Sequence, residues 1–139
     1  MNVQQFISNY QEAFGGQTEL PLVFWYSDEP FGSVSKINGC LFKGFKAVRA
    51  GSPISLNEEL IGCAGGKLYT GYGPMSDYIP NFVSLKEKYK QTPEMVLDYI
   101  RDLNIPKAPK QFLNFARIDQ VESFDKIEGV LFLATADVL

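Results

Sequence analysis

Hydrophobic positions at helical spacing mark the beginning of the chain. Apolar side chains recur every three or four residues from Val3 to Phe14, and the glycines at 15 and 16 follow directly. This period gathers the apolar side chains on one face of a helix, and glycine is a common helix stop. We therefore predict an amphipathic helix over residues 3–14 whose apolar face packs in the core.

The same periodicity predicts three more helices. Asn38 is a good N-cap, and positions 41, 44, 45 and 48 follow at helical spacing, so a helix from about Gly39 to Ala50 is expected, ended by Gly51. A less regular helix is expected over about residues 81–90. The clearest helix begins after Thr92, which supplies a cap before Pro93, and continues to Leu103.

Short apolar runs predict strands between these helices. Residues 21–26 are apolar and bounded by proline, residues 111–118 alternate loosely, and residues 129–136 form a nearly continuous apolar run. The last run is typical of a strand that is buried on both faces, whereas residues 52–60 are polar and predict a loop. Together the elements predict an α/β or α+β fold, a single layered domain with a small sheet and about four helices.

Composition excludes several classes of function. A chain of 139 residues suits one domain, and 45% apolar with 21% charged residues is ordinary for a globular protein. A net charge of -3 has the wrong sign for a nucleic-acid surface. The apolar runs fall short of the roughly 18 to 20 residues that cross a bilayer, and the N-terminus does not read as a secretory signal. We expect no nucleic acid, no membrane span and a cytoplasmic location.

Histidine is absent, and this fact limits the available chemistry most. Neither a Ser-His-Asp nor a Cys-His arrangement can be built within the chain, and the commonest zinc ligand is missing. Any acid or base must be a carboxylate, lysine, tyrosine or cysteine. Two cysteines in a chain without a secretory signal are expected to be reduced thiols, and no metal site is predicted.

A glycine-rich segment, IGCAGGKLYTGYG over residues 61–73, holds five of the twelve glycines. It matches no nucleotide motif, because Ile61 stands where a phosphate loop needs glycine, Leu68 stands where it needs a hydroxyl, and Ser76 replaces the third glycine of the dinucleotide fingerprint. Consecutive glycines still allow backbone N–H groups to close around an anion. The alternative is a tight strand-to-helix crossing that needs small residues.

The two cysteines are the candidate catalytic residues. Cys40 falls in the first turn of the expected helix with Lys43 one turn later, and both features favour a thiolate. Cys63 lies beside the backbone amides of the glycine-rich segment. The alternative for Cys40 is ordinary packing, because free cysteine is among the most buried residue types.

Tyrosines near the glycine-rich segment complete the candidate ligand site. Tyr69, Tyr72 and Tyr78, with Asp77 close by, are expected to line a pocket with inward hydroxyls, or else to be half-buried surface aromatics. The candidate ligand-binding residues are Cys40, Lys43, Cys63, Gly65, Gly66, Lys67, Tyr69 and Tyr72.

The combined pattern resembles a known family. Gly39-Cys40, Gly51, the run Gly62-Cys63-Ala64-Gly65-Gly66 and then Gly71 are similar to the bacterial and archaeal proteins called domain of unknown function 169. The resemblance covers about Pro21 to Leu139 and implies no activity, since none is assigned to the family. Members run on beyond the last expected strand, so the chain resembles a short or truncated member.

Three hypotheses of function follow from these residues. The first is a domain that binds a small anionic metabolite or cofactor at the glycine-rich, cysteine-containing segment. The second is a thiol-dependent enzyme or redox protein that uses Cys40 or Cys63. The third is a non-catalytic subunit that is completed by a partner chain. That partner could be a second copy of the same chain in a homo-oligomer.

Overall fold

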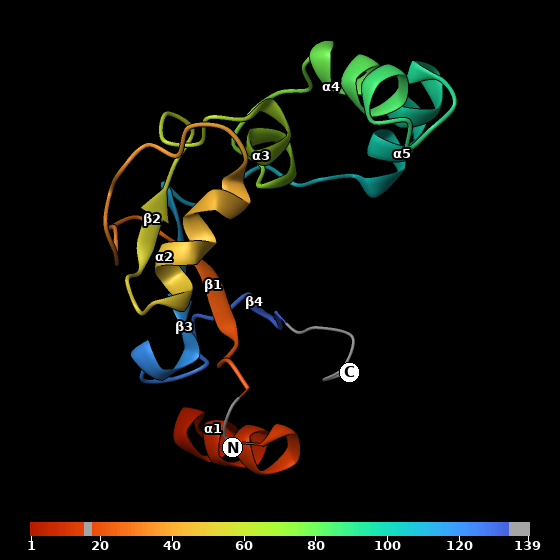
Figure 1. Cartoon of the computed structure of the whole chain (residues 1–139). Coiled ribbons are helices and arrows are strands. Elements are labelled where there is room, and N and C mark those ends of the chain that lie inside the picture. Colours follow the sequence, from red (N-terminus) through yellow and green to blue (C-terminus); the bar gives the residue numbers. More distant parts are fainter. Residues whose placement is uncertain (16–17, 134–139) are drawn as a thin grey trace.

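An antiparallel sheet of four strands lies at the centre of the structure (Figure 1), a computed structural model that describes residues 1–15 and 18–133. The strands are β1 (Leu22–Ser27), β2 (Ile54–Leu56), β3 (Phe112–Arg117) and β4 (Gly129–Leu131), in the order β2-β3-β1-β4. All three pairings are antiparallel. Since helices pack on an antiparallel sheet, the fold is α+β, one of the two classes that the sequence predicted.

Five α-helices occur in the described part of the chain. They are α1 (Val3–Phe14), α2 (Phe45–Arg49), α3 (Ala64–Tyr69), α4 (Tyr78–Asn81) and α5 (Pro93–Leu103). Three further helical pieces are not α-helical: η1 (Leu41–Gly44) and η3 (Ile118–Gln120) are 3₁₀, and η2 (Phe82–Lys86) is a π-helix. The predictions for α1 and α5 are confirmed, and Thr92 caps α5 by accepting a hydrogen bond from the backbone N–H of Met95.

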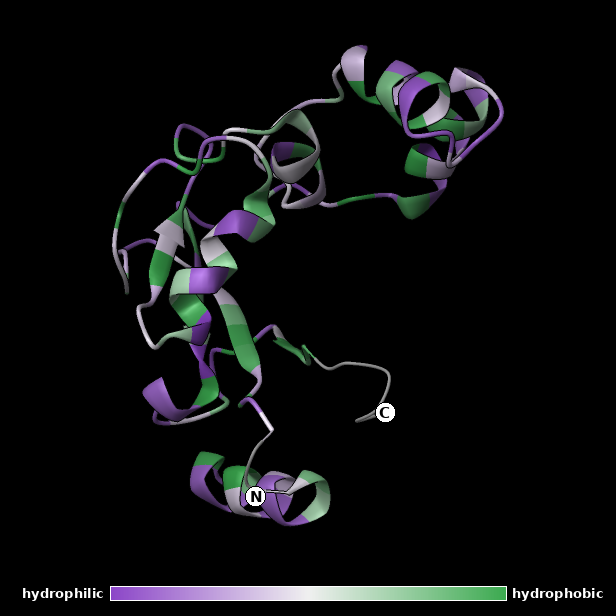
Figure 2. Ribbon diagram, viewed as in Figure 1, coloured by the Kyte–Doolittle hydropathy of each residue, from purple (hydrophilic) through white to green (hydrophobic). Residues whose placement is uncertain are grey.

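Each face of the sheet contributes side chains to a separate hydrophobic cluster. Trp25 packs with Val3 of α1 on one face, and Leu22 packs with Phe45 of α2 on the other. This alternation follows from the two-residue period of a strand, and it makes the sheet a middle layer between helices. Figure 2 shows that β1 is mainly hydrophobic, as a strand covered on both faces must be.

A helical arm, residues 78–103, stands apart from the sheet and contains α4, η2 and α5 (Figure 1). Its small core joins Leu68 of α3 to Ile79, Val96 and Ile100. Two connecting segments, residues 70–77 and 104–111, lead to the arm, and the N–H of Ala108 donates to the carbonyl of Gly71 at 2.9 Å. The glycine-rich segment therefore ends at the joint between the sheet and the arm.

The helix expected over residues 39–50 is shorter than predicted. Gly39 has φ +88° and Cys40 is extended, so the helical part begins only at Leu41 as η1 and continues as α2. The reason is a tertiary contact, because Ile37 forms a parallel bridge with Ile61 and so ties the chain just before Gly39 to another segment. The predicted stop is confirmed, since Gly51 has φ +88°.

Two strand predictions need correction. The segment 52–60, expected to be a loop, contains β2, whose three residues are all buried against β3. The last run forms β4 only over Gly129–Leu131, at an edge of the sheet and partly exposed rather than buried on both faces. Residues 134–136 of that run lie outside the described residues. The inner strands are β1 and β3, and β3 has five successive buried residues.

The helix expected over about residues 81–90 starts earlier and ends earlier. It begins as α4 at Tyr78 and passes into the π-turns of η2, which end at Lys86. Lys88 has φ 57° and reverses the chain. Proline at position 80 is tolerated because it lies in the first turn, where its missing N–H is not needed.

Candidate functional site

The glycine-rich segment is a short helix rather than a loop. Cys63 is the N-cap of α3, and its Sγ accepts a hydrogen bond from the N–H of Gly66 at 3.2 Å. The N–H of Lys67 donates to the carbonyl of Cys63. Two amides that the anion hypothesis requires are therefore occupied within the helix. This geometry does not favour an anion cradle at residues 63–67.

Close packing explains the glycines at positions 62 and 66. A Cβ on Gly62 would lie 2.3 Å from the carbonyl oxygen of Ile37, and a Cβ on Gly66 would lie 2.7 Å from the Sγ of Cys63 and 2.9 Å from Cγ2 of Ile61. Gly65, in contrast, has only Tyr69 Cε2 within 4.0 Å. The structure thus favours the alternative of a tight crossing that needs small residues.

The two cysteines lie just after two backbone segments that pair with each other. The N–H of Ile37 donates to the carbonyl of Leu60, and the N–H of Gly62 donates to the carbonyl of Ile37, both at 2.9–3.0 Å. Cys40 and Cys63 follow this pairing by three and two residues, counted from Ile37 and Ile61. The side chain of Cys40 is exposed, that of Cys63 is partly buried against the core, and both thiols are free.

Cys40 lies one position before the helix rather than in its first turn, where the sequence predicted it. It is the N-cap of the 3₁₀ helix η1, with an extended backbone, and η1 continues directly into α2. Lys43 instead folds back over the chain, with its Nζ 3.1 Å from where a Cβ on Gly39 would lie. Lys67 packs its Cβ toward Gly73 in the last turn of α3. The structure therefore gives each lysine a local packing contact.

The three predicted tyrosines lie in three different environments. Tyr69 lines a pocket at the joint between sheet and arm. Tyr72 lies beside Tyr26, with ring centroids 6.2 Å apart, and its hydroxyl donates to the carbonyl of Lys110. Tyr78 is 60% exposed and stacks on Phe82 in the arm.

The pocket, called here the joint pocket, has a volume of about 220 Å³. Its walls come from the end of β1, the end of α3, the connector after α5 and the residue before β4. The lining residues are Tyr26, Tyr69, Thr70, Ile105, Pro106, Lys107, Pro109 and Glu128. Of the predicted ligand-binding residues only Tyr69 is among them, and neither cysteine is.

Burial and charge keep the tyrosine hydroxyls of this region protonated. Burial raises the pKa of Tyr26, and the nearby carboxylate of Glu128 raises it further. Burial likewise raises the pKa of Tyr72 well above its ordinary value, with a smaller contribution from Tyr26. Burial also raises the pKa of Tyr69. Near neutral pH these groups are neutral hydroxyls that can donate or accept hydrogen bonds.

Charges of both signs border the joint pocket. Lys107 lies on the connector and Glu128 lies before β4, where its N–H donates to the carbonyl of Phe24. Among the described residues neither Lys107 nor Glu128 forms an ion pair with another side chain. The hydroxyl of Tyr26 donates to the carbonyl of Thr70 at 3.0 Å and holds two of the walls together.

Sequence reasoning missed Tyr26, Thr70, Lys107 and Glu128. They are separated by tens of residues, and only the sheet order and the contact between the two connectors bring them together. The sole local signal was Tyr26, a polar aromatic near the end of an otherwise apolar strand.

Comparison with protein-family models, with curated proteins and with solved structures finds no match for this chain. The resemblance to the domain of unknown function 169 family therefore stays a prediction. Within residues 1–15 and 18–133 no helix is long and apolar enough to cross a membrane. In the same ranges no three cysteine or carboxylate side chains gather as a metal site would require.

Proposed function

We propose that the protein is a binding module that holds a small zwitterionic metabolite in the joint pocket. The supporting observation is that one cation, one carboxylate and neutral tyrosine hydroxyls line a single pocket from four separate segments. Convergent polar groups on apolar walls are typical of small-molecule sites. The ligand's acidic group would contact Lys107 and its amino group Glu128.

The size of the joint pocket restricts the ligand. Its volume of 220 Å³ is below the roughly 300–1,000 Å³ that is usual for drug-sized ligands, so a molecule of amino-acid size is favoured. A purely anionic ligand would meet the carboxylate of Glu128, which costs binding energy through like-charge repulsion. Compared with the first hypothesis from the sequence, the proposal keeps small-molecule binding. It places the site in the joint pocket instead of the glycine-rich segment, and the ligand carries a positive group as well as a negative one.

A thermal-shift series with free amino acids tests the proposal. Each amino acid is compared with the amine that lacks its carboxylate and with the acid that lacks its amino group. At about 10 times Kd a true ligand stabilises the fold by about 1.4 kcal/mol, which raises Tm by about 4–6 °C for a chain of this size. Both truncated analogues should give clearly smaller shifts.

Matched variants locate the binding. Lys107→Ala should remove the preference for the acidic group, and Glu128→Gln should remove the preference for the amino group. Lys126→Ala and Glu122→Gln, exposed positions outside the joint pocket, serve as controls and should bind as the wild type does. The proposal fails if no compound raises Tm, or if the pocket variants retain the full shift.

A second candidate function is thiol–disulfide exchange between Cys40 and Cys63. It is supported by the pairing of Ile37 with Ile61, which brings the two cysteine-bearing segments side by side. The Cys40 thiolate would attack oxidised glutathione and release one glutathione. The Cys63 thiolate would then attack Cys40 Sγ and release the second glutathione, so that one disulfide is reduced as another forms.

Mass spectrometry distinguishes this candidate from simple thiol modification. Treatment with oxidised glutathione should remove two hydrogens from the wild-type chain without leaving glutathione attached. Cys63→Ser should stop at the mixed disulfide on the exposed Cys40. A wild-type chain that also stops at the mixed disulfide would rule the candidate out. A cytoplasmic location, which we also propose, would keep both thiols reduced at rest.

A further inference from the structure

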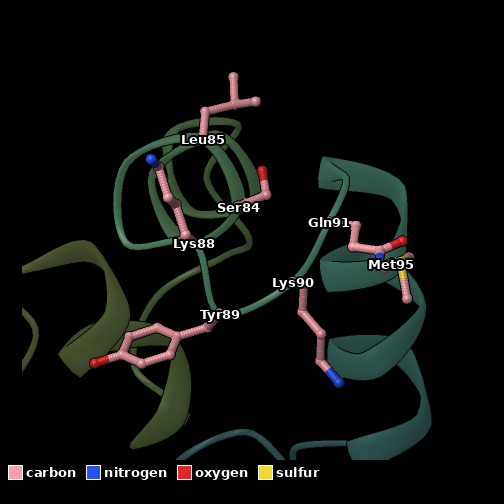
Figure 3. Close-up of a pocket in the computed structure, with 7 residues that line it drawn as sticks. All are labelled: Ser84, Leu85, Lys88, Tyr89, Lys90, Gln91 and Met95. Carbon is pink, nitrogen blue, oxygen red and sulfur yellow. The ribbon is translucent and has the colours of Figure 1, made fainter.

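A second pocket lies on the helical arm, away from the joint pocket. Its volume is about 560 Å³ and Figure 3 shows the side chains that surround it. They come from the end of η2, the turn after it and the first turn of α5. The lining residues are Ser84, Leu85, Lys88, Tyr89, Lys90, Gln91 and Met95. We call this site the arm pocket.

The backbone of the arm pocket is unusual at two neighbouring places. η2 is a π-helix, and π-turns are frequent at functional sites. Lys88 has φ 57°, and the N–H of Tyr89 donates to the carbonyl of Val83, so Lys88 holds the left-handed position of a helix C-cap where glycine is usual. A lysine in this left-handed conformation is strained where glycine would not be.

The apolar side chains of the arm pocket are exposed to an unusual degree. Leu85 is 65%, Tyr89 75% and Met95 45% exposed, and Tyr99 on the next turns of α5 is 48% exposed. Met95 belongs to the most adaptable type of apolar side chain, which suits a binding surface. Exposed apolar side chains that gather at one place, rather than scatter singly, are a feature of interaction sites.

The lining of the arm pocket is positively charged, although the chain as a whole is negative. Its lining residues include Lys88 and Lys90 and no acidic residue, whereas the complete chain has a net charge of -3. Glu87 and Glu94 lie next to the lining residues in the sequence. Lys90 lies over the ring of Tyr99 at 5.3 Å, and Lys86 lies over the ring of Phe82 at 6.0 Å. No side-chain ion pair in the described ranges neutralises Lys86, Lys88 or Lys90. The surface therefore has positive charge available for an acidic partner.

We propose that the arm pocket docks an acidic peptide segment of a partner protein. An apolar side chain of that segment inserts beside Leu85, Tyr89 and Met95, and its flanking carboxylates lie on Lys88 and Lys90. The pocket is far too large for a single phosphate, and its apolar walls would leave a free anion poorly held. A peptide that alternates acidic and apolar residues matches both the charge and the walls.

Fluorescence polarisation with two labelled peptide libraries tests this docking. The first library alternates Asp or Glu with Leu, Phe or Trp, and the second has Lys or Arg in place of the acids. The acidic library should bind and the basic one should not, and raising the ionic strength should weaken the binding. Equal binding of both libraries, or of neither, would overturn the proposal.

Charge-reversal variants place the binding on the arm. The pair K88E and K90E should weaken binding of the acidic library by about tenfold or more. The pair K36E and K46E, exposed lysines of the sheet body, applies the same charge change and should have an effect of less than about twofold. Retained binding by the arm variant, or an equal loss in the control pair, would overturn the proposal.

Lys88→Gly separates a docking role from a structural one. Glycine relieves the left-handed backbone, so the unfolding midpoint should rise while the affinity for the acidic peptides falls. Unchanged affinity would show that the lysine side chain does not contact the partner, which contradicts the proposal.

Three other occupants give different results, and each would overturn the proposal. Complete displacement of the peptides by inorganic phosphate would indicate a small-anion site. Equal binding to vesicles of phosphatidylcholine and phosphatidylglycerol would indicate a lipid surface. A concentration-dependent dimer that K88E and K90E abolish would indicate a second copy of this chain, measured by light scattering.

Discussion

Substituting alanine at the adjacent positions Gly65 and Gly66 should change stability in opposite directions. In Gly66→Ala the new Cβ lies 2.7 Å from Cys63 Sγ and 2.9 Å from Ile61 Cγ2, well inside the optimal contact distance of about 3.5–4.0 Å. Ile61 is only 1% exposed and cannot move aside. Such overpacking costs about 1–3 kcal/mol, and the better helix propensity of alanine offsets about 0.5–1 kcal/mol of it.

Gly65→Ala makes the same chemical change without the contact. Its Cβ meets only Tyr69 Cε2 at 4.0 Å, which is ordinary van der Waals contact. The gain in helix propensity, about 0.5–1 kcal/mol, then remains and the variant is stabilised. The two variants should therefore differ by about 2 kcal/mol in free energy of unfolding.

Urea unfolding followed by the fluorescence of the single, buried Trp25 measures this difference. With a slope of about 1–3 kcal/mol per molar urea, the two midpoints should be about 1 M apart. Gly62→Ala, whose Cβ would lie 2.3 Å from a backbone oxygen, should be at least as unstable as Gly66→Ala. If both α3 variants were stabilised equally, the packing explanation of the glycine-rich segment would be wrong.

Three further predictions concern polar groups. Asn114→Ala should lower the free energy of unfolding by about 3 kcal/mol or more. The fully buried side-chain amide accepts hydrogen bonds from Ser55 Oγ at 2.7 Å and from the N–H of Phe31, and it donates one to the carbonyl of Trp25, so these groups would lose their partner. Urea unfolding measures the loss, and a value under about 1 kcal/mol would contradict the network. Arg117 lowers the pKa of Asp119, so this carboxylate stabilises the fold above its ordinary pKa of about 3.8 and the contribution is lost as the pH falls below it; Asp119→Asn should flatten acid unfolding there, and an unchanged acid profile would refute the pairing. Burial raises the pKa of Tyr72, so the folded state keeps its proton while the unfolded state ionises, and stability should fall above about pH 10; Tyr72→Phe should reduce that alkaline loss, and an identical alkaline profile would show that Tyr72 is not responsible.

Local patterns predicted the elements whose formation depends on local interactions. The helix α1 follows from apolar periodicity, and α5 follows from apolar periodicity and the cap at Thr92. The structure adds a cap at Asn2, whose side chain accepts a hydrogen bond from the N–H of Gln5. β1 and β3 are long enough for their apolar runs to be recognised. In these cases neighbouring residues alone determine the conformation, so a single sequence is sufficient.

Tertiary contacts determined what the sequence could not predict. Cys40 is extended because Ile37 pairs with Ile61, and β2 is only three residues long and pairs with a strand far along the chain. The glycines at 62 and 66 drew attention to an anion site, but their neighbours in space show that they permit close packing. The joint pocket depends on where two connectors meet, and no spacing rule encodes such a meeting.

Nuclear magnetic resonance of the ¹⁵N-labelled protein tests the joint pocket most directly. The amino acid that raises Tm most is titrated into the protein while the amide signals are followed. We expect the signals of Tyr26, Thr70, Lys107 and Glu128 to move together along one saturable curve, while those of the arm pocket stay in place. Shifts confined to other residues, or no saturable shift, would contradict the account.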